Sequence, residues 1–267
     1  MKVKLIIPKF QKLNESYYPN QVFKDRLKVL EQAFLNNDID LVVTSHNYFC
    51  FGSDFKSYSS DDIKKFINNC LITILNPLKN KKPIILGLDF CFNINPFIGI
   101  NALVCFLEVD DSNGNYIYKT HIWECWKDQT CCSSKCFSKQ NHKRFICFKD
   151  QEIGLLSCGD IANDCHEKGE LLKNCDLYID LSHASLTGHT SQAKIPDEMI
   201  SKGKSRYVIV TQQVSGPTTI LNYKKDGYKY IFPQDTTHQC VKRYCVNGKI
   251  AGVFVDIEIV KNIETIT

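Results

Sequence analysis

Five short, mainly apolar segments constrain the fold of this chain more than any other feature of its sequence. They lie at Val3–Ile7, Ile39–Thr44, Lys82–Leu88, Ile153–Cys158 and Leu177–Leu181. Each segment has strand length and lacks the strict polar alternation of a strand with one face in solvent. Continuous apolar strands of this kind occur where helices or a second sheet cover both faces. The pattern therefore predicts buried strands in a layered α/β fold.

Amphipathic helices are predicted between these strands. Asn20 is suited to cap a helix whose apolar side chains recur at helical spacing. This apolar face consists of Phe23, Leu27, Leu30 and Phe34. A second helix is predicted to open at Ser59-Ser60 and to end before Asn76-Pro77, because the residue before a proline disfavours helical geometry. A third, short helix is expected over about residues 161–172.

The remaining segments predict hairpins. Asn101–Val109 and Tyr116–Ile122 flank an Asp-Ser-Asn-Gly turn. The C-terminal third reads as all-β, with strands at Tyr207–Gln212, Thr218–Tyr223, Tyr228–Phe232 and Ile250–Ile259. Two sheets covered by helices fit this order of elements. No linker or low-complexity segment interrupts it, so residues 1–267 are predicted to form a single domain.

The composition of the chain indicates which kinds of partner and which cellular compartment to expect. The net charge is +4 and the lysines are scattered, which disfavours nucleic acid as a partner. The apolar run at the N-terminus is too short for a signal peptide, and no run of 18 or more apolar residues indicates a membrane span. Without a secretion signal, the 14 cysteines are expected to be reduced thiols in a cytoplasmic protein.

The segment Gly154-Leu-Leu-Ser-Cys158-Gly-Asp160 holds the main candidate for chemistry. It places a cysteine between an apolar strand and a helix-forming segment, a turn that presents the thiol at the edge of a sheet. A nearby helix N-terminus lowers the pKa of a thiol. Cys158 is therefore predicted to be the most reactive of the cysteines; the alternative is a small core residue, as most strand cysteines are.

Three motifs in order resemble those of the nitrilase, or carbon–nitrogen hydrolase, superfamily. Asp40-Leu-Val-Val43 resembles the strand that precedes the family's catalytic glutamate, and Lys119-Thr-His-Ile122 resembles its lysine motif. The segment around Cys158 resembles its cysteine motif, and the resemblance runs from about residue 3 to residue 259. It implies a four-layer α-β-β-α sandwich that assembles as a homodimer or a higher homo-oligomer.

The resemblance also implies roles for residues. Cys158 corresponds to the nucleophile, and Lys119 supplies positive charge where the oxyanion forms. The general base departs from the family pattern, because the glutamate position falls on His46 counted from the preceding strand and on Asn47 counted back from Gly52. His46 is the candidate base, since imidazole titrates near neutral pH.

Two further residues are candidates for binding substrate. Asn47 cannot accept a proton at neutral pH, but its amide can hydrogen-bond a ligand. His183 lies in a Ser/Thr-rich segment after a core strand, and the resemblance places the corresponding loop beside the substrate.

Three functions remain open from the sequence. The first is a thiol-dependent hydrolase that cleaves a non-peptide carbon–nitrogen bond of a small amide-like or nitrile substrate through a Cys158 acyl-enzyme, without a cofactor. The second is a catalytically impaired scaffold of the same fold that binds a ligand or partner. The third is a zinc-stabilised interaction domain built on the cysteines between Cys125 and Cys136 with His142. Their spacing matches no paired Cys-x-x-Cys module, so no metal site is predicted.

Overall fold

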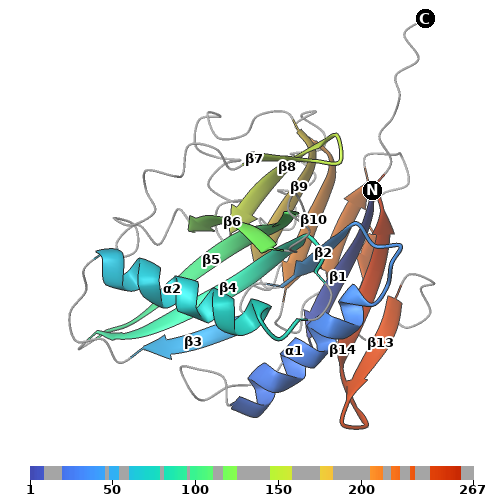
Figure 1. Ribbon diagram of the computed structural model, residues 1–267. Helices are drawn as coiled ribbons and strands as arrows, with labels where there is room; N and C mark the ends of the chain where they lie inside the picture. Colours follow the sequence, from blue (N-terminus) through green and yellow to red (C-terminus); the bar gives the residue numbers. More distant parts are fainter. Residues whose placement is uncertain are drawn as a thin grey trace, which may run out of the picture.

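Two β-sheets packed face to face form the centre of the structure (Figure 1). The computed structural model describes residues 1–8, 20–45, 48–53, 60–78, 81–94, 97–110, 117–124, 145–157, 175–182, 205–212, 218–222, 229–231 and 241–259. In this part of the chain one sheet has eight strands and the other has six; they are called the large sheet and the small sheet below.

The large sheet is mixed. Its strands are β1 (Lys2–Pro8), β2 (Leu41–Thr44), β3 (Phe49–Ser53), β4 (Ile84–Ile94), β5 (Phe97–Asp110), β6 (Ile117–Glu124), β13 (Val241–Val246) and β14 (Lys249–Glu258). They follow the order β13-β14-β1-β2-β4-β5-β6, with β3 also paired to β4. Strands β1, β2 and β4 run parallel, whereas β14 and β5 are antiparallel to their neighbours β1 and β4.

The small sheet has a parallel centre. Its strands are β7 (Phe145–Phe148), β8 (Gln151–Ser157), β9 (Cys175–Ser182), β10 (Ser205–Gln212), β11 (Thr218–Asn222) and β12 (Lys229–Ile231). Strands β8, β9 and β10 are parallel, while β7, β11 and β12 add antiparallel edges. The carboxyl ends of β8, β9 and β10 therefore lie along the same edge of this sheet.

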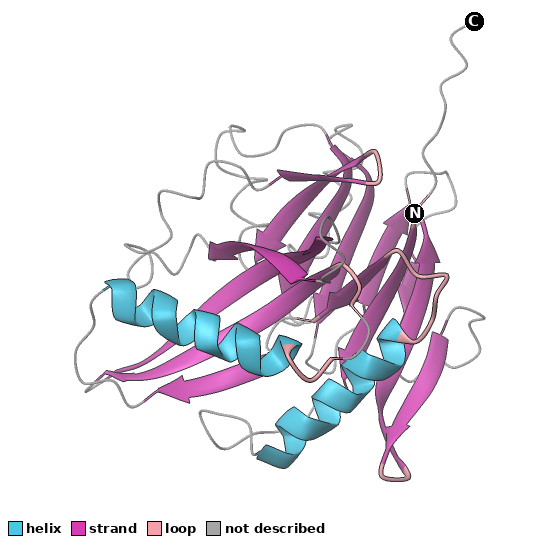
Figure 2. Ribbon diagram, viewed as in Figure 1, coloured by secondary structure: helices cyan, strands magenta, loops and turns pink. Residues whose placement is uncertain are grey.

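Two helices cover the outer face of the large sheet (Figures 1 and 2). Helix α1 (Asn20–Phe34) and helix α2 (Ser60–Leu75) bury their apolar faces against alternate residues of β1, β2 and β4. The predicted helix starts and the end before Asn76-Pro77 are confirmed. Neither described helix combines the length and the apolar character that crossing a bilayer requires.

The space between the sheets is filled by the alternate residues that face away from these helices. From the large sheet it receives Val3, Leu5, Leu41 and Val43, and from the small sheet it receives Ile153, Leu155, Leu177 and Ile179. Each of these side chains is at most 1% exposed. The predicted buried strands are therefore confirmed, because both faces of these short apolar runs are needed to build two layers of core.

Some local expectations change in the structure. The turn after β7 is formed by Lys149 and Asp150, with φ angles of 48° and 59°, and Gln151 already pairs with Phe148. Residues 151–152 thus belong to strand β8, which begins two residues before the predicted strand Ile153–Cys158. Strands β3 and β13 were not predicted from the sequence. The third helix, expected over about residues 161–172, lies outside the described residues.

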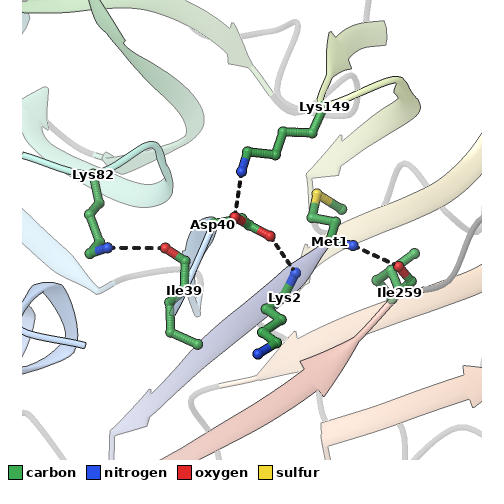
Figure 3. A network of polar contacts seen from close by, with 7 residues as sticks. All are labelled: Met1, Lys2, Ile39, Asp40, Lys82, Lys149 and Ile259. Carbon is green, nitrogen blue, oxygen red and sulfur yellow. Dashed lines mark hydrogen bonds and ion pairs between the residues drawn. The ribbon is translucent and has the colours of Figure 1, made fainter. Parts of the chain in front are cut away.

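A polar cluster joins the two sheets where β2 begins (Figure 3). The Asp40 carboxylate accepts hydrogen bonds from the Lys2 amide at 2.8 Å and from the Lys149 ammonium at 2.6 Å. Burial raises the pKa of the Asp40 carboxyl, but these hydrogen bonds and the charges of Lys149 and the amino terminus outweigh it and hold the pKa below its usual value. Since Lys149 belongs to the β7–β8 turn, the ion pair ties the small sheet to the large one.

Asp40→Asn is expected to lower the free energy of unfolding by roughly 0.5–1 kcal/mol at neutral pH, a small value because Lys149 is 56% exposed. A carboxyl with a depressed folded pKa stabilises the fold above its unfolded pKa of about 3.9, and the effect is lost as the pH falls through the folded pKa. Urea unfolding at pH 7 and pH 3 measures the difference. Asp38→Asn, at an exposed position two residues earlier, is the control and should change neither value.

Candidate functional site

Lys119 is the one predicted site residue that falls within a described segment, on strand β6. Cys158, His46, Asn47 and His183 lie outside the described residues. The chain positions that precede them are described, however. Cys158 follows Ser157 at the end of β8, His183 follows Ser182 at the end of β9, and His46 follows Ser45, one residue after β2. The ends of β2, β8 and β9 therefore mark where these residues continue the chain.

The ends of the three parallel strands of the small sheet are level with one another. Ser157 of β8 pairs with Leu181 of β9, which in turn pairs with Thr211 of β10. Because adjacent strands lie about 4.8 Å apart, this row spans roughly 10 Å from Ser157 to Thr211. Cys158 and His183 each follow a residue at this edge in the sequence.

A hydrogen bond brings the end of β2 to the same edge. The Thr211 hydroxyl donates to the Thr44 carbonyl oxygen at 3.1 Å, across the space between the two sheets. Thr44 Oγ1 accepts a hydrogen bond from the Gly87 amide at 2.9 Å and donates to the Ser45 carbonyl oxygen at 3.1 Å. Thr44, Ser45 and Thr211 are all 0% exposed. The carboxyl ends of β2 and β10 thus meet at one end of the inter-sheet core.

The chain on the far side of residues 46–47 is also held firmly. The Arg26 guanidinium of helix α1 donates to the Tyr48 carbonyl oxygen, and the Tyr48 hydroxyl donates back to the Arg26 carbonyl oxygen at 3.0 Å. The guanidinium carbon lies 5.3 Å from the centre of the Tyr48 ring. Arg26 is 5% exposed and Tyr48 is 0% exposed. The two candidate base positions, His46 and Asn47, are therefore flanked by buried, hydrogen-bonded residues.

The register of strand β6 places Lys119 away from this edge. Gly87, whose amide contacts Thr44, pairs with Val104 of β5, and Val104 pairs with Trp123 of β6. Lys119 pairs with Glu108, four residues before Trp123 along β6, which corresponds to roughly 13 Å.

An aromatic contact supports the same placement. The ring of Phe106, which pairs with His121, lies 6.0 Å from the ring of Phe148 at the start of the β7–β8 turn. Ser157 is six residues further along β8 from the partner of Phe148, or roughly 20 Å. The register therefore places the backbone of Lys119 away from the Thr44–Thr211 edge. The pocket shared by Lys119 and Cys158 stays a prediction, because Cys158 lies outside the described residues.

The described thiols differ in their capacity to react. Burial raises the pKa of Cys70 to about 12 and that of Cys175 to about 11, and it raises the pKa of Cys105 further. These three thiols have almost no thiolate at neutral pH, and only the thiolate is nucleophilic. Cys147 and Cys245 are exposed. They are the described thiols that would compete with Cys158 for an electrophile.

Two further observations concern groups that bind metals or protons. Within the described ranges there is no cluster of three or more histidine, cysteine or acidic side chains, and the residues from Cys125 to His142 lie outside those ranges. Asp180 of β9 is 0% exposed, and the sequence analysis did not single it out. It alternates with Ile179 and Leu181, which face the inter-sheet core, and so belongs to the opposite face of the small sheet.

Solved structures of carbon–nitrogen hydrolases share this fold. A carbon-nitrogen hydrolase from Helicobacter pylori has a TM-score of 0.55 and 13% sequence identity, and the match covers 97% of this chain and 89% of that chain. A CN-hydrolase superfamily protein from Xanthomonas campestris, with an arsenic adduct in its active site, has a TM-score of 0.53 and 12% identity over 97% and 90% of the two chains.

An amidase from Nesterenkonia sp. is a third solved structure with a similar fold. A mutant of that amidase shows covalent addition of the acetamide moiety of fluoroacetamide at its active site cysteine. Its TM-score is 0.52 at 11% identity, and the match covers 96% of this chain and 90% of that chain.

The comparisons are informative about the fold and not about sequence relatives. No protein-family model matches the sequence, and no curated protein is found as a sequence relative. The structural matches nevertheless cover nearly all of the chain. The fold is that of the nitrilase superfamily, as the resemblance implied, and it is an α/β fold of the α-β-β-α sandwich type.

Proposed function

We propose that this protein is a carbon–nitrogen hydrolase that cleaves a small amide or nitrile through an acyl-enzyme on Cys158. The observation that carries the proposal is the meeting of strand ends from both sheets at the Thr44–Thr211 hydrogen bond. Cys158, His46 and His183 each follow, within two residues, a described position at this edge. A cysteine and a base supplied from two sheets of this fold are the groups that such a reaction needs.

The proposed reaction with an amide has two halves. The Cys158 thiolate attacks the carbonyl carbon, and the carbon–nitrogen bond breaks as the amine leaves with a proton, which produces a thioester. Water then attacks the thioester carbon and gives one proton to the base. The base passes that proton to the departing sulfur, and the carboxylic acid and the thiol are released. Both halves need a proton acceptor and positive charge or hydrogen-bond donors at the oxyanion.

His46 is proposed as the proton acceptor, with Asn47 and His183 as substrate contacts. Ser45 and Tyr48 are both buried and bracket the two-residue segment from His46 to Asn47. Consecutive Cα atoms are 3.8 Å apart, so His46 cannot lie far from the inter-sheet edge at Ser45. An imidazole is a competent base for a thiol, as cysteine–histidine pairs show in other enzymes.

The positive charge at the oxyanion is proposed to come from Lys119, which the resemblance implies, or from Lys127. Both lysines are four residues from Trp123, and Lys127 lies outside the described residues. Single-turnover kinetics of Lys119→Ala and Lys127→Ala decides between them. Loss of the lysine that acts at the oxyanion is expected to slow Cys158 acylation by about 10²–10³-fold, and the other substitution should change the rate less than threefold.

Trapping the intermediate tests the proposal directly. The protein is incubated with a panel of small aliphatic amides and nitriles, and the adduct is sought by intact mass and by peptide mapping. The expected result is an acyl group on Cys158, with slow release of ammonia in solution. An adduct confined to Cys147 or Cys245, the exposed described thiols, would contradict the proposal.

The alternative is a catalytically impaired scaffold of the same fold. It is favoured by one observation, the absence of a carboxylate at positions 46 and 47. Binding of a small amide without any adduct or ammonia across the panel would support the scaffold. Self-association into a homodimer or a higher homo-oligomer, which is proposed for either function, is measured by sedimentation at micromolar concentration.

A further inference from the structure

The hydroxyl of Ser45 is a buried polar group with no hydrogen-bond partner among the described residues. Ser45 is 0% exposed, and in the described part of the chain its Oγ atom has neither a donor nor an acceptor within hydrogen-bond distance. Its two neighbours at this edge are satisfied, because Thr44 Oγ1 contacts Gly87 and Thr211 Oγ1 contacts the Thr44 carbonyl oxygen. A buried hydroxyl left unpaired destabilises a fold, so such a group calls for an explanation.

The position of Ser45 relates the hydroxyl to the candidate site. Leu41 and Val43 of β2 face the inter-sheet core, and Ser45 continues this alternation one residue past the end of the strand. The Thr44–Ser45 peptide carries the carbonyl oxygen that accepts the Thr211 hydrogen bond. Ser45 therefore lies between the sheets beside Thr211, which is two strand spacings from Ser157 in the small sheet, and Ser45 is next in sequence to His46.

We infer that the Ser45 hydroxyl binds the substrate, as a hydrogen-bond partner for a polar atom of a small amide. This inference rests on the proposed function and adds a specificity-determining residue to it. Substrate binding supplies the partner that the free protein lacks, so the cost of the unpaired hydroxyl is relieved only in the complex. The occupant has the chemistry of a primary amide, whose oxygen accepts and whose nitrogen donates.

The test compares Ser45→Ala with the unmodified protein in two reactions of Cys158. In the first, the thiolate displaces iodide from iodoacetamide and forms a sulfur–carbon bond, which leaves a primary amide in the site. In the second, it attacks methyl methanethiosulfonate, takes the methylthio group and releases methanesulfinate, so that no amide is present. Loss of one neutral hydrogen bond is expected to slow the iodoacetamide reaction roughly fivefold and to leave the second reaction unchanged.

Thermal unfolding gives an independent second readout. Removal of an unpaired buried hydroxyl is expected to raise the Tm of Ser45→Ala by about 2 °C. Thr211→Val is the matched control, because it removes a buried hydroxyl that has a partner, and its Tm should fall by about 2–4 °C. A Tm that falls in Ser45→Ala would show a structural partner for the hydroxyl and overturn the inference.

The labelling outcomes separate this inference from the proposed function. If Cys158 reacts and both rates are unchanged in Ser45→Ala, the inference fails and the proposed function stands. If both rates fall equally, Ser45 acts on the thiol and not on the substrate, and the inference again fails. If Cys158 does not react in the unmodified protein, the proposed function fails and the inference fails with it.

Discussion

Replacement of Cys158 with alanine is expected to abolish hydrolysis of any amide or nitrile that this protein cleaves, with a fall in kcat of at least about 10³-fold. Alanine has no group that can form the thioester, and neither half-reaction can begin without it. Ammonia release under single-turnover conditions, with the acyl adduct followed by mass, measures the effect. No acyl adduct should form in Cys158→Ala.

A second thiol provides the control for this experiment. Cys147 of β7 is exposed and belongs to the small sheet, as β8 does. Cys147→Ala should therefore hydrolyse substrate at the unmodified rate. Hydrolysis that survives in Cys158→Ala but disappears in Cys147→Ala would show that the chemistry belongs to a different part of the small sheet.

The second large effect concerns the base. His46→Ala is expected to slow acylation by on the order of 10²–10⁴-fold, the usual cost of losing a general base. His46→Glu restores the carboxylate of the resembled family and should preserve or raise the rate. Deacylation should be slow in the unmodified protein, because a protonated imidazole near a lysine ammonium places two positive charges together. Burst kinetics separates the two half-reactions.

Asn47→Ala tests whether the family's glutamate position corresponds to His46 or to Asn47. An amide cannot take a proton at neutral pH, so Asn47→Ala should raise KM and leave kcat within about threefold. Should His46→Ala and Asn47→Ala both leave a Cys158-dependent rate unchanged, the base lies in another segment. Asp180, a buried carboxyl on β9, would then be the first residue to replace.

The structure describes contacts on both sides of residues 46–47, the proposed base segment. Arg26 of α1 and Tyr48 exchange two hydrogen bonds, each side chain donating to the other residue's carbonyl oxygen. The Thr211 hydroxyl of β10 donates to the Thr44 carbonyl oxygen. Helix α1 and the small sheet therefore act on opposite flanks of residues 46–47. Rigid elements of this kind position catalytic side chains more accurately than loops do.

The sequence by itself determined which segments are buried strands and helices. Apolar runs such as Leu41–Val43 and Leu177–Ile179 carry apolar side chains on both faces of the strand, so both faces must be covered by other elements. The amphipathic periodicity of α1 and α2 likewise required a sheet beneath them. The resemblance of three ordered motifs to the nitrilase superfamily implied how these strands and helices are layered.

Strands β3 and β13 contain residues that favour strands, such as Phe, Val and Tyr. They were not predicted because both are short and neither is a continuous apolar run. Strand β13 has the sequence Val-Lys-Arg-Tyr-Cys-Val at a sheet edge, where it pairs with β14 alone. Strand β3 contains Gly52 and pairs with β4. Strand β3 pairs with β4, which is distant in sequence, and β13 pairs with the longer strand β14. Such pairing depends on the neighbouring strand as well as on the residues of the strand itself.

Tertiary structure alone decided which strand ends meet. The β5–β6 hairpin register puts Lys119 opposite Glu108, four residues from Trp123 at the level of the Thr44–Thr211 edge, or about 13 Å along the strand. A register is fixed by the turn and by every pair along the ladder, so sequence order could not give this separation. The pocket shared by Lys119 and Cys158 stays a prediction. The unpaired hydroxyl of Ser45 was invisible for the same reason, because whether a serine finds a partner depends on what the opposite sheet brings to it.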